Sequence, residues 1–475
     1  MAETLTPDIC VIGGGSGGLS VAAAAAAFGV PVVLVEKGKM GGDCLNYGCV
    51  PSKALIAAAK RAALAQSAPA FGVKLQKPAV DFEAVHKHVH EVIAGIAPND
   101  SVERFTALGV RVIKGAAQFL DRRTIHVGTE IEIKARRFVI ATGSSPSAPP
   151  IEGLERVPYL TNATVFDLTT RPKHLLIIGA GPIGLELAQA FRRLGSEVTV
   201  LEAAQPLAKD DPECAAIVLD QLAREGVTIK SGVTIARVKR ARNKVQVMLG
   251  GGDGEATIEG SHLLVAAGRK PNVEGLDLKS AGVKYERRGI TVDKKLRTSN
   301  KKIYAIGDVV GGLQFTHVAN YHAGLVIRHA LFRLPVKVNE NAIPWVTFTD
   351  PELAQVGMTE VRAKERYGSI RVLRWPYGEN DRAETERETH GHIKVITSKR
   401  GKILGATIVG AQAGELISTW SLAVSQGLNI RAIASMVMPY PTLAEVGKRS
   451  AINYFAPSLT SPAVRRIITL LRWFG

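Results

Sequence analysis

The sequence predicts an α/β protein built on two parallel-sheet units of the same design, for three reasons. The chain of 475 residues is too long for one ordinary core, which favours two to four domains. Its residues are 46% hydrophobic and 22% charged, the composition of a globular protein. A strand, a glycine-rich loop, a helix, a second strand and an acidic residue follow one another twice along the chain, and this order is typical of α/β folds.

The first unit begins near the N-terminus. Its parts are the strand Asp8–Ile12, the loop Gly13–Gly18, the alanine-rich helix Val21–Phe28, the strand Pro31–Val35 and the acidic Glu36. We expect Gly13 to allow the turn, Gly15 to let a pyrophosphate approach the backbone, and Gly18 to let helix and strand pack closely. Glu36 is placed to accept hydrogen bonds from a ribose. The unit is therefore predicted to bind a dinucleotide.

The same unit recurs in the middle of the chain. Its parts are the strand His174–Ile178, a loop whose key glycines are Gly179, Gly181 and Gly184, the helix Leu185–Leu194, the strand Glu197–Leu201 and the acidic Glu202. Two such units can hold two dinucleotides at once, the arrangement for passing a hydride from a nicotinamide to a flavin. Glu202 favours the free 2′-hydroxyl of NADH, and residues 203–206 offer no arginine for the phosphate of NADPH. We expect NADH, with NADPH not excluded.

A pair of cysteines lies between the two units. Cys44 and Cys49 are separated by four residues, of which Gly48 permits a bend. Pro51 suits the first turn of a helix that runs on through Ala54–Leu64, so Cys49 is predicted near a helix N-terminus. The partial positive charge there stabilises a thiolate, and the pair is predicted to be redox-active.

With these motifs the sequence resembles the class I pyridine nucleotide–disulfide oxidoreductases, in the group of lipoamide dehydrogenase and mercuric reductase. The segments that carry the resemblance are the cysteine pair, Ala141–Gly143, Gly268–Asn272, Ala305–Asp308 and Phe348–Glu352. The resemblance implies a glutathione-reductase-like fold with an α+β C-terminal dimerisation domain. It implies an FAD-binding domain (1–148), an NAD(P)-binding domain (149–270), a central domain that completes the FAD site (271–340) and an interface domain (341–475).

The resemblance also assigns roles to individual residues. Cys44 matches the interchange thiol that meets the substrate, and Cys49 matches the charge-transfer thiol beside the flavin. Lys53 matches the lysine at the flavin N5, with Glu186 as its ion-pair partner, and Asp308 matches the aspartate on the ribityl chain. The further residues expected to bind a cofactor are Gly42, Ala116, Thr142, Gly143, Gly268 and His317.

Two positions depart from the family pattern. Asp43 stands beside Cys44 where the common residue is Thr, and a carboxylate repels a pyrophosphate unless it points away or binds N–H groups. Tyr440 occupies the position of the histidine that a partner subunit normally supplies, whereas its companion Glu445 remains. Tyrosine titrates near 10 and histidine near 6.5, so Tyr440 is a poor base at neutral pH. The alternative is that Tyr440 only packs at the dimer interface.

These features favour a mercuric-reductase-like enzyme that reduces a metal ion or a small acceptor, because a soft metal held by two thiolates needs no proton shuttle. The terminal stretch 465–475 has no cysteine, unlike that of mercuric reductases, which argues against mercury as the physiological substrate. The alternatives are dihydrolipoamide dehydrogenase, a membrane-associated quinone reductase and an FAD-binding sensor without turnover. We expect a homodimer in which Tyr440 and Glu445 reach the partner's active site.

The net charge of +17 suggests an anionic ligand, an acidic partner or a membrane surface. No nucleic-acid-binding motif accompanies the charge, and no cysteine spacing indicates a metal site. Ser461 can cap a basic, aromatic helix from Pro462 that would either lie on a membrane surface or pack on the protein. Without a signal-peptide pattern or a long apolar run, a cytoplasmic location is expected.

Overall fold

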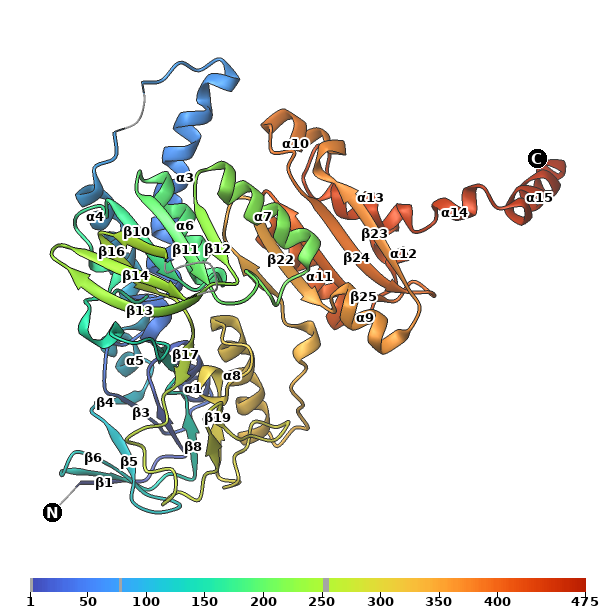
Figure 1. Cartoon of the computed structure of the whole chain (residues 1–475). Coiled ribbons are helices and arrows are strands. Elements are labelled where there is room, and N and C mark those ends of the chain that lie inside the picture. The colour runs from blue at the N-terminus through green and yellow to red at the C-terminus, as the bar shows by residue number, and fades with distance from the viewer. Residues whose placement is uncertain (1–2, 77–78, 251–255) are drawn as a thin grey trace. The chain divides into compact units, whose positions relative to one another are not determined.

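The computed structural model describes residues 3–76, 79–250 and 256–475 (Figure 1). It contains two compact units. The first unit comprises residues 1–179, 190–203 and 233–338, and the second comprises residues 180–189, 204–232 and 339–475. The predicted division into four domains stays a prediction.

The first unit is built on a five-stranded parallel sheet. Its order is β20 (Ile303–Ala305), β8 (Arg137–Ile140), β2 (Ile9–Ile12), β3 (Val32–Glu36) and β4 (Val110–Lys114). Ile9 and Val11 face a core beneath α1 (Ser16–Ala27) and α8 (Thr316–Ala330), which pack side by side in Figure 1. Cys10 and Ile12 point to the opposite core. Because both faces are covered, the central strand is apolar throughout.

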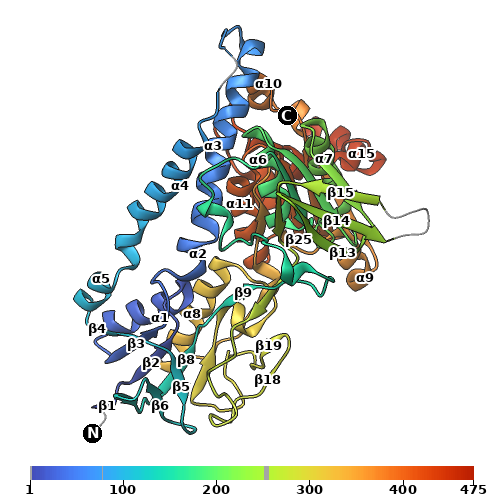
Figure 2. The same cartoon turned by 60° about the vertical axis from the view of Figure 1, so that its left-hand side comes forward.

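A second parallel sheet in the first unit contains the repeated motif. Strand β10 (His174–Ile178) lies between β11 (Glu197–Glu202) and β16 (His262–Val265). Three antiparallel strands, β13 (Thr234–Ala241), β14 (Lys244–Gly250) and β15 (Ala256–Gly260), form a separate sheet. Figure 2 shows the long helix α3 (Cys49–Ser67) beside α4 (Phe82–Ile96), and the two helices are in contact.

The predicted elements are present, but their helices begin earlier than expected. The helix predicted from Val21 begins at Ser16, because Gly15 takes the extended N-cap conformation and the loop residues after it join the first turn. The helix predicted from Leu185 is α6 (Pro182–Arg193). The helix predicted from Pro51 begins at Cys49.

The second unit is built on a five-stranded antiparallel sheet. The order is β21 (Trp345–Thr347), β22 (Glu352–Gly357), β25 (Ile403–Gly410), β24 (His392–Ser398) and β23 (Ile370–Pro376). Its core includes Ile408 of β25 and Trp420 of α11 (Ala413–Ser425). Helix α7 (Pro212–Arg224) packs on β22 and β25, and α13 (Glu445–Asn453) packs on β23 and β24.

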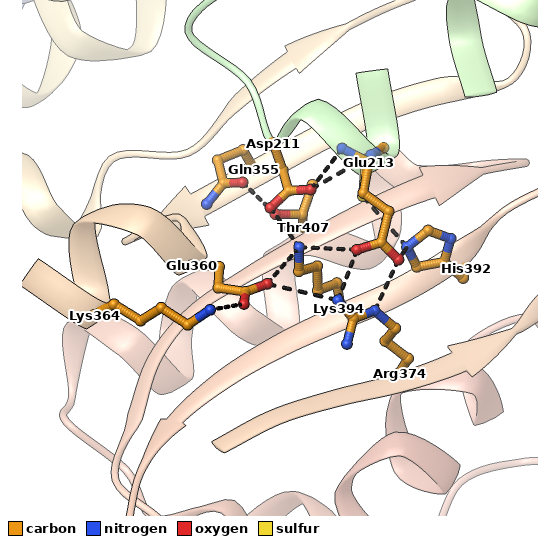
Figure 3. A network of polar contacts seen from close by, with 10 residues as sticks. Asp211, Glu213, Gln355, Glu360, Lys364, Arg374, His392, Lys394 and Thr407 are labelled. Atoms are coloured by element: carbon orange, nitrogen blue, oxygen red, sulfur yellow. Dashed lines mark hydrogen bonds and ion pairs between the residues drawn. The ribbon is translucent and has the colours of Figure 1, made fainter. Parts of the chain in front are cut away.

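A buried lysine ties α7 to this sheet (Figure 3). The Lys394 side chain is 4% exposed, and its Nζ lies 2.8 Å from Asp211 Oδ2, 3.0 Å from Glu213 Oε2 and 2.9 Å from Glu360 Oε2. Burial alone would lower the pKa of Lys394, but the three carboxylates together raise it above its usual value. Asp211 also caps α7 by accepting hydrogen bonds from the backbone of Glu213 and Cys214.

The C-terminal segment of the second unit ends in helix α15 (Pro462–Leu471), which has no buried residue. The predicted helix from Pro462 is present, but the expected cap is not, because the Ser461 side chain makes no capping hydrogen bond. Figure 1 shows α15 extending away from the sheet of its unit. Among the residues that the structure describes, no helix is both long and apolar enough to cross a membrane.

Candidate active site

The glycine loop after β2 is shaped by close backbone contacts. Gly13 has φ +114°, and a Cβ built there would lie 2.4 Å from the carbonyl oxygen of Ala141. A Cβ at Gly18 would lie 1.9 Å from the carbonyl oxygen of Gly13. Both positions therefore require glycine for the reasons expected from the sequence, a turn at Gly13 and close packing at Gly18.

Gly15 differs from its two neighbours in the motif. A Cβ built at Gly15 has its nearest neighbour at 3.8 Å, the Cα of Gly42, and its φ of −84° suits any residue. The protein itself therefore does not require glycine at this position. Gly15 also opens α1 without a side-chain cap, so the first N–H groups of that helix point toward an anion-binding position. This arrangement fits the pyrophosphate of FAD, which would be held by Gly15 and the start of α1.

The carboxylate of Glu36 ends β3 beside the loop. It accepts hydrogen bonds from the backbone N–H groups of Gly14 and Gly38. These contacts fix the side chain at the carboxyl edge of the parallel sheet, where a ribose is bound in dinucleotide folds. The contact with the ribose stays a prediction.

The two cysteines that are predicted to be redox-active lie on consecutive helices of the first unit. Cys44 belongs to α2 (Gly42–Asn46), and Cys49 is the first residue of α3. Asn46 braces the segment by donating hydrogen bonds from Nδ2 to the carbonyl oxygens of Met40 and Gly42, at 3.0 and 2.9 Å. The position of Cys49 at a helix N-terminus agrees with the sequence prediction and stabilises negative charge on its sulfur.

The surroundings of the two thiols divide their roles. A hydrogen bond with Cys49 raises the pKa of the Cys44 thiol, and burial and the charges of Cys49 and Asp43 raise it further. Cys49 Sγ also lies 3.7 Å from Thr316 Oγ1, at the start of α8. The hydrogen bond with Cys49 and burial thus favour the protonated form of Cys44, whereas the helix N-terminus favours negative charge on Cys49.

The other cysteines are not equipped for the same chemistry. Cys10 and Cys214 are fully buried, and burial raises the pKa of each thiol well above its ordinary value. A thiol that is buried and protonated is unreactive, so the accessible thiol chemistry of the chain lies with Cys44 and Cys49.

Asp43, the acidic residue beside Cys44, is held by two side chains. Arg269 Nη2 lies 3.2 Å from Asp43 Oδ2, and Asn162 Nδ2 donates to Asp43 Oδ1 at 3.3 Å. The Arg269 side chain is 13% exposed. The expected repulsion between Asp43 and a pyrophosphate is thus offset by a cation within the protein, an arrangement that the sequence did not indicate.

Arg269 also reaches the predicted flavin-binding aspartate. It donates from Nε to Ser144 Oγ at 2.7 Å and from Nη2 to the Ser144 carbonyl oxygen at 2.8 Å. Ser144 Oγ in turn donates to Asp308 Oδ2 at 2.6 Å, and Arg269 Nε lies 3.9 Å from the same oxygen. The pKa of Asp308 is raised above its ordinary value, mainly by burial and further by the charge of Asp43. The Ser144 hydrogen bond and the charge of Arg269 oppose this rise.

The remaining residues predicted for FAD lie around the same sheet. Thr142 and Gly143 follow β8, where Thr142 Oγ1 donates to the Asn272 carbonyl oxygen at 2.7 Å and the Asn272 N–H donates to the Gly143 oxygen at 2.9 Å. Gly42 is the first residue of α2, with φ +60°, and Ala116 lies exposed between β4 and β5 (Ala117–Phe119).

Two histidines follow the Asp308 motif on α8. His317 stacks on Phe315 with ring centroids 5.3 Å apart, and its contact with the flavin stays a prediction. His322 is buried, accepts a hydrogen bond from the Gly307 backbone and has a pKa lowered to about 4 by burial. His322 is therefore a neutral structural residue that supports the turn before Asp308.

The second glycine motif keeps the turn expected of it. Gly179 has φ +108°, and a Cβ there would lie 2.6 Å from the Ala266 carbonyl oxygen. A Cβ built at Gly268 or at Gly181 would meet no atom within 4 Å. Gly268 has φ +150°, whereas the φ of Gly181 is one that any residue adopts. Gly184 lies in the first turn of α6, and Glu202 ends β11. Their contacts with a nicotinamide cofactor stay predictions.

The predicted pair of Lys53 and Glu186 belongs to different units, and its ion pair stays a prediction. Lys53 lies on α3, and its Nζ donates to Ser52 Oγ at 3.4 Å. Glu186 lies on α6, is 5% exposed and accepts a hydrogen bond from the Phe348 backbone at 2.9 Å. Phe348 is part of one of the motifs that carry the family resemblance.

Tyr440 and Glu445 lie in the second unit, before and at the start of α13. Tyr440 is 69% exposed, and its hydroxyl donates a hydrogen bond to Asp381 Oδ2 at 2.8 Å. This hydrogen bond, together with the charges of Asp381 and Glu445, raises the pKa of Tyr440 above its ordinary value. Tyr440 is thus an even poorer base than its residue type implies.

Four residues of the site were missed by sequence reasoning. Arg269 lies within a motif that carried the resemblance, but no role was assigned to it. Ser144, Asn162 and Thr316 gave no signal, because single Ser, Asn and Thr residues are common in strands, loops and helices alike. In the part of the chain that the structure describes, no group of three or more His, Cys, Asp or Glu side chains is placed to hold a metal ion.

Comparison with known proteins adds the family context. Residues 7–323 match the family described as pyridine nucleotide-disulphide oxidoreductase, and residues 343–451 match its dimerisation domain. The chain is 37% identical to a mercuric reductase of Lysinibacillus sphaericus, over 94% of this chain and 82% of that protein. It is also 37% identical to a dihydrolipoyl dehydrogenase of Staphylococcus aureus, over 94% of this chain and 96% of the relative.

A solved structure shows the same fold. The HOCl-induced flavoprotein disulfide reductase RclA of Escherichia coli, in a Cu(II) complex, aligns with a TM-score of 0.83 and 30% identity, covering 93% of this chain and 98% of RclA.

Proposed function

The chain belongs to the class I pyridine nucleotide-disulphide oxidoreductases, and on this premise we propose that it uses NADH to reduce a soft metal ion or another small acceptor through Cys44 and Cys49. The family and the glutathione-reductase-like fold class predicted from the sequence are confirmed. The protein is an FAD-dependent disulfide oxidoreductase that works with FAD and NAD(P)H, and its dimerisation domain supports a homodimer. The choice of acceptor and of NADH is our proposal.

The observation that carries this choice is the state of Tyr440. Its hydroxyl is bound to Asp381, and the pKa of Tyr440 is raised above its ordinary value. Reduction of a disulfide substrate to a dithiol requires a group that exchanges protons near neutral pH, whereas reduction of a metal ion bound by two thiolates does not. An acceptor that takes electrons without a proton partner therefore suits this chain better than a disulfide.

The cysteines account for both electrons and protons. When bound, FAD relays two electrons from a nicotinamide to the cysteine pair. Reduction with one hydride equivalent breaks the S–S bond and leaves a thiol on Cys44 and a thiolate on Cys49. Reoxidation re-forms the S–S bond, releases the proton of Cys44 and delivers two electrons, enough for one Hg(II) ion or two Cu(II) ions. The names of the mercuric-reductase relative and of the Cu(II) complex of RclA support these two ions as first candidates.

An acceptor screen by stopped-flow spectroscopy tests the proposal. The enzyme is reduced with one equivalent of NADH and mixed with Hg(II), Cu(II), lipoamide, glutathione disulfide or a quinone. We expect a metal ion to reoxidise the enzyme fastest, and Cys44→Ser to slow this step by about a hundredfold or more because the disulfide cannot re-form. Cys10→Ala, which removes a buried thiol, should react like the unmodified enzyme. Fastest reoxidation by lipoamide would overturn the proposal.

Dihydrolipoamide dehydrogenase is the second candidate, because Glu445 is kept and the dihydrolipoyl dehydrogenase relative is as similar as the mercuric reductase. Rapid reoxidation by lipoamide in the same screen would favour it. A membrane-associated quinone reductase is a third candidate, since Trp473 and Phe474 are 84% and 82% exposed beside Arg472. Equal flotation on anionic liposomes with and without residues 462–475 would exclude a role for this tail.

A further inference from the structure

Asp43 sits where its charge acts on the cysteine pair. It is the immediate neighbour of Cys44 on α2, and its side chain is 40% exposed. A carboxylate therefore stands directly beside the thiol that is predicted to meet the substrate. The carboxylate is fixed by Arg269 at 3.2 Å and Asn162 at 3.3 Å, and it therefore cannot rotate freely into solvent.

The cation that holds Asp43 is shared with a second carboxylate. Arg269 Nε donates to Ser144 Oγ at 2.7 Å, and Ser144 Oγ donates to Asp308 Oδ2 at 2.6 Å. A single guanidinium thus serves two carboxylates, and with both ionised the cluster Asp43–Arg269–Asp308 has a net charge of −1. With Thr in place of Asp43, the same cluster would be neutral.

A negative charge beside a dithiol acts against its reduced form. Reduction converts a neutral disulfide into a thiol and a thiolate, so the reduced pair carries one more negative charge than the oxidised pair. The carboxylate disfavours that added charge, and solvent reduces the effect because the Asp43 side chain is 40% exposed. The two electrons held by the pair then leave more readily to an acceptor.

We propose that Asp43, held by Arg269, is a positioning residue that lowers the reduction potential of the Cys44–Cys49 couple and couples it to the site of Asp308. This inference rests on the proposed redox function of the pair. It explains why the chain tolerates a carboxylate near the predicted pyrophosphate: Arg269 offsets the repulsion, and the charge strengthens the pair as a reductant.

The test measures the potential of the couple directly. The purified flavoprotein is equilibrated at pH 7 with dithiothreitol of graded oxidised-to-reduced ratios, and Cys44 and Cys49 are alkylated and counted by mass spectrometry. We expect Asp43→Asn to shift the reduction equilibrium about tenfold toward the dithiol, about 30 mV for a two-electron couple. Asp43→Thr should shift it in the same direction. Asp277→Asn, a matched change of charge at a carboxylate that accepts a hydrogen bond from Ser280, should leave it unchanged.

The outcomes separate the two claims. If the unmodified pair shows no two-electron titration, the proposed function fails. If the pair titrates but Asp43→Asn has the same equilibrium as the unmodified enzyme, or shifts toward the disulfide, only the role of Asp43 is overturned. The flavin absorbance spectrum of each variant verifies folding. Arg269→Lys keeps the positive charge but weakens the hold on Asp43, so it should shift the equilibrium toward the dithiol, in the same direction as Asp43→Asn but by less.

Discussion

Gly15 and Gly18 belong to one sequence motif, yet their surroundings differ. A Cβ at Gly18 would meet the Gly13 carbonyl oxygen at 1.9 Å, whereas a Cβ at Gly15 would have its nearest neighbour at 3.8 Å. Glycine at position 18 is therefore required by the packing of the protein itself. Glycine at position 15 is required by the pyrophosphate that we expect to approach the loop.

This difference predicts two distinct defects. Gly18→Ala should destabilise the protein by about 1–3 kcal/mol or more, because backbone must move. Gly15→Ala should change the free energy of unfolding by less than about 0.5 kcal/mol. It should nevertheless weaken FAD binding by about tenfold or more, about 1.4 kcal/mol. Chemical unfolding and flavin fluorescence on titrating the apoprotein measure the two effects; undiminished FAD affinity in Gly15→Ala would contradict the assignment.

The sequence predicted residues whose role is local and missed those defined by distant contacts. Gly13, Gly18 and the start of α3 follow from neighbouring residues in the chain, so motif spacing was sufficient. The contact of Arg269 with Asp43 joins segments far apart in sequence, and only the folded chain brings them together. For the same reason Asp43 was interpreted from the sequence as a repulsive departure without its compensating cation.

At the scale of elements, α7 depends on Lys394 for its attachment to the sheet of the second unit. Lys394→Met should destabilise the protein by about 3–5 kcal/mol at pH 7, because it leaves buried Asp211 without its cation. Lys364→Met, which removes a 58% exposed partner of the same Glu360, should cost less than about 1 kcal/mol. Urea unfolding followed by circular dichroism compares the two variants; equal losses would count against the buried cluster.

Acid should weaken the same cluster. The pKa of Glu213 is lowered from an ordinary value of 4.5 to about 2, and its hydrogen bond with Arg374 is the largest cause. A carboxylate with a lowered pKa in the folded state stabilises the fold fully above pH 4.5, and this contribution is lost as the pH falls toward 2. The difference in stability between Lys394→Met and the unmodified protein should therefore shrink over this interval. A difference that stays constant from pH 6 to 2 would show that Glu213 does not take part.

At the scale of the whole molecule, we predict a homodimer in which Tyr440 of each subunit lies at the cysteines of the other. Tyr440→His should raise the rate of lipoamide reduction, because histidine titrates near neutral pH. A chain with both Tyr440→His and Cys44→Ser, paired with an unmodified chain, should show the same gain per intact site. If the gain appears only when Tyr440→His and intact cysteines are on the same chain, the prediction that Tyr440 acts at the cysteines of the other subunit is wrong.

The burial of Cys10 and Cys214 has a practical consequence for anyone handling the protein. A colorimetric thiol reagent applied to the native reduced chain should count two sulfhydryls, those of Cys44 and Cys49, and none after oxidation of the pair. After unfolding without reductant, the oxidised chain should yield two and the reduced chain four. Counting sulfhydryls before and after unfolding thus reports two properties of a preparation. These are the fraction of molecules in which the Cys44–Cys49 pair is reduced and the fraction that are correctly folded.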